Sequence, residues 1–256
     1  MPDFSAIDFT GILPFIVVGF AAQVIDGALG MAFGLINSTL LVSVLGMPPA
    51  LASASVHAVE TFTTAASGVS HIYNRNVDWR LFRRLVIPGV IGGVLGAYVL
   101  SNVDASVAKP FVMAYLAGTG VYLLYRAWRG PLALKSPKVV APLGFVGGFL
   151  DAAGGGGWGP VGTSNLLVQG SAPRTTIGTV NTSEFFLTAT VSAAFFTQMG
   201  LAAFTLATLG LLIGGLVAAP IGGILAKRVP ARPLMVMVGT LLTLTSAYSI
   251  WQALAT

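Results

Sequence analysis

The sequence contains no cysteine and few charged residues. The absence of cysteine excludes disulfide bonds and thiol chemistry. Only 8% of the residues are charged, against about 25% in soluble domains. The net charge of +5 comes from basic residues in short segments between apolar runs, which argues against a nucleic-acid-binding face. With 55% hydrophobic residues, the composition predicts one integral membrane domain over residues 1–256.

Long apolar runs fill most of the chain, and most of them approach the roughly 20 residues that cross a bilayer as a helix. The runs cover residues 11–45, 50–70, 85–100, 111–127, 139–168, 175–198, 204–226 and 234–251. The first and fifth runs are too long for one ordinary span and short for two. We therefore expect each of these two to form a broken or re-entrant hairpin of two half-length helices.

The chain is a duplicated unit, because Val18–Gly30 reappears as Leu143–Gly155 and the correspondence continues afterwards. Repeat one is expected at residues 11–128, a linker at 129–138 and repeat two at 139–256. In a membrane protein an internal duplication points to transport. The aligned pairs include Asp26 and Asp151, Gly30 and Gly155, and Glu60 and Glu184.

Basic residues mark opposite loops in the two repeats. Four arginines lie between residues 75 and 84, whereas the matching segment 198–206 is uncharged. The next loops reverse this pattern, since 101–108 holds only an aspartate and 226–232 holds three basic residues. Basic loops stay in the cytoplasm. The sequence therefore predicts an all-α protein of two inverted-topology repeats, each a hairpin plus three transmembrane helices. It is multi-pass in the cell membrane, with both termini outside and the linker inside.

Four consecutive glycines, Gly154–Gly157, follow Asp151 in the second hairpin. Each glycine costs a helix about 1 kcal/mol, so a run of them inside a membrane requires a reason. We interpret it as an anion cradle of backbone N–H groups at a helix N-terminus. Close helix packing is the alternative, and we expect it for isolated pairs such as Gly92-Gly93 and Gly214-Gly215. Asp26 and Asp151 are expected at the hairpin turns.

A polar stripe at helical spacing follows each hairpin, and its members in repeat one are Ser53, His57, Glu60, Thr64, Ser67 and His71. A lipid-facing stripe of this kind would be very costly, so it faces a cavity or a partner helix. The functional interpretation assigns proton coupling to His57, Glu60 and Glu184. Interhelical hydrogen bonding is the alternative.

Inside the apolar runs, Lys and Arg occur only at the ends. An anion site must therefore use backbone N–H groups and neutral donors, which suits a small oxyanion that has to be released. The expected substrate-binding residues are Gly30, Asn37, Ser38, Gly154, Gly155, Gly156, Gly157, Ser164, Asn165, Asn181 and Ser183. We expect no cofactor, no metal ligand and no nucleic acid as partner. Membrane lipid and a second copy of the chain are the other expected partners.

One further motif repeats: the turn Gly46-Met-Pro-Pro49 has the counterpart Gly170-Ser-Ala-Pro173. A basic loop, Asn74–Trp79, follows the first polar helix. Together with the hairpins, these motifs resemble the sulfite exporter TauE/SafE family of membrane permeases over nearly the whole chain. The resemblance implies export of sulfite or organosulfonates such as sulfoacetate, with no enzymatic activity.

The sequence thus predicts alternating access around a midplane site formed by the two hairpins. A passive anion channel is the first alternative. An intramembrane aspartyl protease that uses Asp26 and Asp151 is the second. Its expected context is absent, because glycines follow these aspartates instead of preceding them.

Overall fold

A computed structural model describes residues 9–129, 136–203, 205–225 and 231–255. These residues form helices and no strand, as predicted. The first half contains α1 (Phe9–Leu29), α2 (Phe33–Ser38), the π-helical η2 (Thr39–Val44), α3 (Pro49–Tyr73), α4 (Trp79–Asn102) and α5 (Ala105–Trp128). The second half contains α6 (Ala141–Gly154), the π-helical η3 (Trp158–Thr163), α7 (Ser164–Val168), α8 (Pro173–Met199), the 3₁₀ helix η4 (Gly200–Ala203), α9 (Leu206–Leu225) and α10 (Ala231–Ala255).

Local sequence explains where several helices begin and end. Both α3 and α8 begin with a proline, Pro49 and Pro173, whose missing N–H is unpaired in a first turn anyway. The Asp78 side chain accepts the backbone N–H groups of Arg80 and Leu81 and so caps α4. Helix α6 ends at Gly155, which adopts the left-handed conformation at φ +72°.

Both long apolar runs are interrupted, as their lengths predict. The break in the first run lies between α1 and α2, and the break in the second lies between α6 and η3. The second hairpin starts and ends at the same end of the molecule. There, the Gln169 side chain accepts from the backbone N–H groups of Lys138 and Val139 and donates to the Val139 carbonyl.

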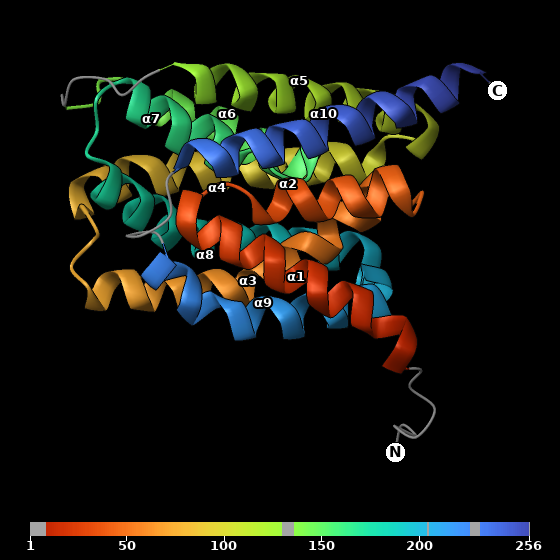
Figure 1. Ribbon diagram of the computed structural model, residues 1–256, viewed down its shortest axis with the longest axis horizontal. Coiled ribbons are helices and arrows are strands. Elements are labelled where there is room, and N and C mark those ends of the chain that lie inside the picture. Colours follow the sequence, from red (N-terminus) through yellow and green to blue (C-terminus); the bar gives the residue numbers. More distant parts are fainter. Residues whose placement is uncertain (1–8, 130–135, 204, 226–230, 256) are drawn as a thin grey trace.

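The helices of the two halves interlock (Figure 1). Helix α1 packs on α9, α4 on α6, α3 on α8 and α5 on α10, so each of these contacts joins one half to the other. Glycines permit two of them. A Cβ at Gly92 would strike the Phe145 carbonyl across α4 and α6, and one at Gly214 would strike the Ile16 carbonyl across α9 and α1. This confirms the packing interpretation of these isolated glycine pairs.

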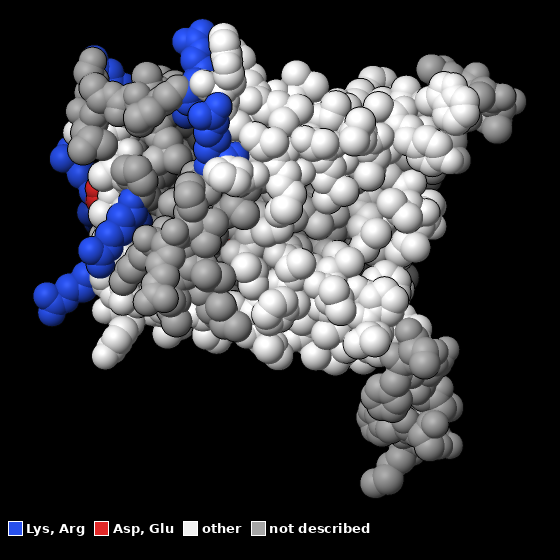
Figure 2. Space-filling model, in the orientation of Figure 1, with Lys and Arg blue, Asp and Glu red and all other residues white. Residues whose placement is uncertain are grey.

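The outer surface is largely apolar. Large hydrophobic side chains such as Trp128, at 77% exposure, and Phe111, at 74%, face outward. Among the described residues, α4 and the Ser106–Trp128 part of α5 are both long and apolar enough to cross a membrane. Figure 2 shows Lys and Arg gathered at one end of the visible face. Helix α1 begins and α10 ends at the opposite end (Figure 1).

Candidate functional site

The two helix breaks are held by the same device. In the first, Asp26 Oδ1 accepts the backbone N–H groups of Ala32 and Phe33 at 2.8 and 3.3 Å. In the second, Asp151 Oδ1 accepts those of Gly157 and Trp158 at 2.7 and 3.0 Å. Each aspartate lies in the last turn of its helix, and its side chain caps the start of the next segment, where N–H groups lack intrahelical partners. Both aspartates thus lie three residues before the break and bind the backbone beyond it.

The two turns pack directly against each other. The Thr163 hydroxyl donates to the Gly30 carbonyl at 3.1 Å, and the Ser38 hydroxyl donates to the Gly155 carbonyl. A Cβ at Gly34 would lie 3.2 Å from Gly156 Cα, so neither turn has room for a side chain at this contact. This contact brings the start of α2 and the start of η3 together in the buried interior.

A small cavity lies at this point, between the turns and the helices α3 and α8. Its volume is about 10 Å³, which is close to the minimum for one water molecule. Four carboxyl groups line it, one from each surrounding element, together with backbone of both turns. The carboxyl groups belong to Asp26 of α1, Glu60 of α3, Asp151 of α6 and Glu184 of α8.

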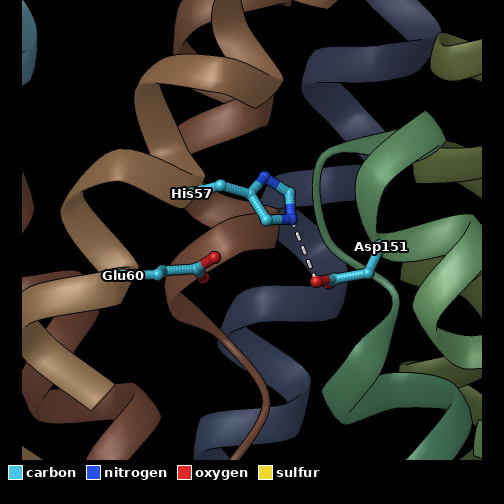
Figure 3. Close-up of side chains that lie close together, drawn as sticks. All are labelled: His57, Glu60 and Asp151. Atoms are coloured by element: carbon cyan, nitrogen blue, oxygen red, sulfur yellow. Dashed lines mark hydrogen bonds and ion pairs between the residues drawn. The ribbon is translucent and has the colours of Figure 1, made fainter. Parts of the chain in front are cut away.

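A histidine pairs with one of these carboxyl groups. His57 Nε2 lies 3.1 Å from Asp151 Oδ2, and both side chains are buried (Figure 3). The other ring nitrogen, Nδ1, lies 2.8 Å from the Ser53 carbonyl. The Ser53 hydroxyl in turn donates to the Ala152 carbonyl at 2.6 Å, which ties α3 to the second hairpin.

The two glutamates differ in their partners. The Glu60 carboxylate accepts a hydrogen bond from the Gly34 backbone N–H of the first hairpin. Glu184 is 7% exposed, and its Oε2 has no hydrogen-bond partner. A buried, unpartnered carboxylate oxygen is expensive, so it requires an explanation in function.

The predicted polar stripe of α3 faces the second half of the chain along its length. Further along α3 from Glu60, the Thr64 hydroxyl oxygen lies 3.4 Å from that of Thr188, and the Ser67 hydroxyl donates to the Asn181 side chain at 3.2 Å. His71 lies near Asn76, away from the cavity. Glu60, at the centre of the stripe, thus lines the cavity. Thr64 and Ser67, further along α3, make the interhelical contacts of the alternative interpretation.

The other predicted substrate residues are distributed around the cavity. The N–H groups of Gly155 and Gly156 donate to the Asp151 backbone carbonyl, and that of Gly157 donates to the Asp151 side chain. An anion can therefore reach the Gly157 N–H only after this side chain turns away. Asn37, Asn181 and Ser183 donate to carbonyls of their own helices, and Asn165 of α7 donates to the Val161 carbonyl of the preceding η3. Gly154 packs on the Tyr115 ring, and the Ser164 side chain lies outside the described part. Their assignment to the substrate stays a prediction.

Sequence reasoning missed two contributions to the site. It named His57 and Asp151 separately, but their pairing depends on how α3 crosses the second hairpin. It also missed Tyr115 of α5, whose hydroxyl donates to the Gly156 carbonyl at 2.9 Å. Tyr115 is one of three tyrosines in α5, and nothing in the sequence distinguishes it from the other two.

Comparison with known proteins yields one family and one relative. The family model described as sulfite exporter TauE/SafE matches residues 15–249. A Bacillus subtilis (strain 168) protein named "Probable membrane transporter protein YtnM" is 42% identical over 248 residues, which cover 93% of this chain and 82% of the relative. No solved structure gives a significant match.

Proposed function

Because the chain belongs to the sulfite exporter TauE/SafE family, we propose that this membrane protein exports a small sulfur oxyanion, such as sulfite or an organosulfonate. The printed name of the Bacillus relative supports membrane transport. The observation that carries the proposal is the buried cavity at which both helix breaks meet. Broken helices with half-helix termini at a central point are typical of transporter binding sites.

The size of the cavity favours a carrier over a passive channel. At about 10 Å³ it is too small for a sulfite ion, which has four non-hydrogen atoms. An anion therefore enters only when the surrounding helices separate, as alternating access requires. A channel would instead need a continuous water-filled path.

The arrangement of helices supports two inverted repeats. In each half a broken helix precedes three long helices, and the breaks are capped by aligned aspartates. The contact of α1 with α9 corresponds to that of α6 with α4. Related by a pseudo-two-fold axis in the membrane plane, both breaks converge on one site. The caps also give Asp26 and Asp151 a role without catalysis, which favours transport over proteolysis.

The basic end supports the cytoplasmic assignment of the linker, with both termini outside. Single cysteines test it, because the chain has none of its own. Asn76, the obvious loop position, is buried, whereas Asn74 and Leu201 are exposed. A membrane-impermeant maleimide applied to intact cells should label Leu201→Cys and spare Asn74→Cys until the cells are opened. Labelling in the reverse order contradicts the orientation.

An anion at four carboxyl groups requires compensating positive charge. Protons on His57, Glu60 and Glu184 are expected to supply this charge, and their role stays a prediction. A pH gradient imposed on proteoliposomes tests it, because proton-coupled flux of sulfite accelerates when the gradient is favourable. Association of two copies of the chain also stays a prediction.

The central experiment measures sulfite efflux from proteoliposomes together with thermal stability of the purified protein. Sulfite or an organosulfonate should raise the apparent melting temperature, whereas carboxylates of similar size should not. Efflux should saturate with sulfite concentration, because a carrier has a finite number of sites. No efflux of any tested sulfur oxyanion, or efflux that rises linearly without saturation, would overturn the proposed carrier.

A further inference from the structure

Beyond this function, and resting on the proposed transport site, we infer that the central cavity binds a divalent first-row transition-metal cation. Its ligands are His57, Glu60 and Asp151, with Glu184 as a fourth. From the sequence no metal ligand is expected. The four residues lie on three different helices and far apart in the chain. Only the packing of α3, α6 and α8 brings them together.

The distances fit metal coordination. One donor atom each from His57, Glu60 and Asp151 lies within 4.8 Å of the others. With bonds of about 2.1 Å, neighbouring ligands of an octahedral ion are about 3.0 Å apart and opposite ligands about 4.2 Å. The His57–Asp151 separation of 3.1 Å matches the shorter value. Small side-chain movements suffice to close the set around an ion.

The orientation of His57 is that of a metal ligand. Nδ1 lies 2.8 Å from a backbone carbonyl, which only accepts, so Nδ1 carries a proton. Metal-binding histidines commonly fix their ring in this way. In the neutral ring Nε2 then presents a lone pair toward the Asp151 oxygen, which also presents lone pairs (Figure 3). A cation between them converts this repulsion into two bonds.

Glu184 provides the second, independent observation. Its Oε2 is buried, lines the same cavity and has no partner. A proton shared by His57 and Asp151 would leave this oxygen unsatisfied, whereas a cation at the centre of the cavity can take it as a ligand. The cavity of about 10 Å³ also suits a single dehydrated ion better than a polyatomic anion.

The negative charge of the four carboxylates is offset by backbone N–H groups and by the proposed cation. Asp26 and Asp151 each face the positive start of a following segment, where two backbone N–H groups reach them. A divalent cation offsets the remaining two carboxylates, Glu60 and Glu184. In the opened site, its free coordination positions can accept an oxyanion oxygen. The imidazole ligand favours zinc, cobalt or nickel over magnesium or calcium.

Cobalt binding tests the inference without any transport measurement. The purified full chain, with any affinity tag removed, is titrated with Co²⁺ and followed by visible absorption. We expect one Co²⁺ per chain, displaced by Zn²⁺ and not by Mg²⁺. The chain has two histidines, so His71→Asn is a matched control on the same helix. His57→Asn should weaken Co²⁺ binding about tenfold or more, whereas His71→Asn should not change it.

Glu184→Gln is a second test variant if His57→Asn fails to fold, and it should also weaken Co²⁺ binding. No Co²⁺ absorption in the original protein, or equal binding by the His57→Asn and His71→Asn variants, overturns the inference. Sulfite efflux that persists in a chelator, from protein that binds no Co²⁺, overturns the metal site alone. Co²⁺ binding without efflux of any oxyanion overturns the proposed function and leaves the metal site intact.

Discussion

The two helix breaks have the same backbone design but face different side chains. Asp26 and Asp151 each cap the segment after their break through two backbone N–H groups. His57 pairs only with Asp151, and its aligned counterpart, Asn181, instead binds Ser67 and its own helix. The duplicated features thus build the scaffold. The side chain that departs from the duplication, His57, lies beside the cavity against Asp151. This asymmetry predicts that the two halves respond differently to matched substitutions.

The largest effect is expected at the contact between the breaks. Gly156 has φ +149°, and a Cβ there would lie 2.7 Å from the Leu35 backbone nitrogen. Gly156→Val should therefore lower stability by about 2–5 kcal/mol and abolish stabilisation by sulfite. Gly162 is a matched control, because it is also buried and has no atom within 4 Å of its Cβ position. Both variants are compared by thermal unfolding in detergent. An equal loss of stability in Gly162→Val would show that the contact between the two breaks does not cause the effect.

Loss of Asp151 should lower stability more than loss of Asp26, because only Asp151 contacts His57. Asp26→Ala leaves two buried N–H groups without their acceptor, which costs about 1–2 kcal/mol. Asp151→Ala does the same and also removes the oxygen that a proton or cation at His57 Nε2 would bind, so we expect about 1 kcal/mol more. Thermal unfolding of both variants measures the difference. A greater loss for Asp26→Ala would contradict the asymmetry of the site.

The two glutamates should respond in opposite directions. Glu184→Gln removes a buried carboxylate oxygen that has no partner, so it should raise stability by about 1 kcal/mol while it reduces sulfite efflux. Glu60→Gln weakens the bond from Gly34 and should leave stability unchanged or slightly lower. Apparent melting temperatures and efflux rates are compared for both variants. A stabilised Glu184→Gln variant with full efflux would assign Glu184 no role in transport.

The smallest effect is expected at the basic end. Arg174, near the start of α8, donates to Asn76 at 2.5 Å and to the Asn74 carbonyl at 3.0 Å. At the opposite end, the corresponding region of α3 lies beside an apolar cavity of about 210 Å³ whose lining includes Ala54 and Gly200. Arg174 thus ties the start of α8 to the loop before α4 at the basic end, whereas at the other end the Asn102 side chain donates to Gln198 at 2.9 Å.

Arg174→Ala should lower stability by about 1 kcal/mol or less and increase the rate of sulfite efflux by easing separation at this end. Arg84→Ala is the control, because Arg84 makes one exposed bond to the Lys138 carbonyl. Thermal unfolding and efflux are measured for both. An Arg84→Ala variant that alters efflux as much as Arg174→Ala would assign the effect to loss of surface charge.

Much of the fold follows from patterns that are local in sequence. Run lengths predicted the two breaks, and Asp26 and Asp151 with their following glycines located the turns, because these residues set backbone conformation within a few positions. The spacing of the polar stripe predicted which face of α3 is buried. The family also follows from sequence, since motif order and duplication need no coordinates.

The tertiary structure alone decided how these elements meet. Among the predicted N–H donors, those of Gly155 and Gly156 bind the Asp151 backbone carbonyl and that of Gly157 binds the Asp151 side chain, because the chain folds back on the end of α6. His57, Glu60 and Glu184 were named for proton coupling, but their convergence with Asp151 depends on the crossing of α3, α6 and α8. Sequence periodicity specifies which face of a helix is polar. It does not specify which distant residue that face meets, because helix packing is set by the fit of side chains and glycines across the whole bundle.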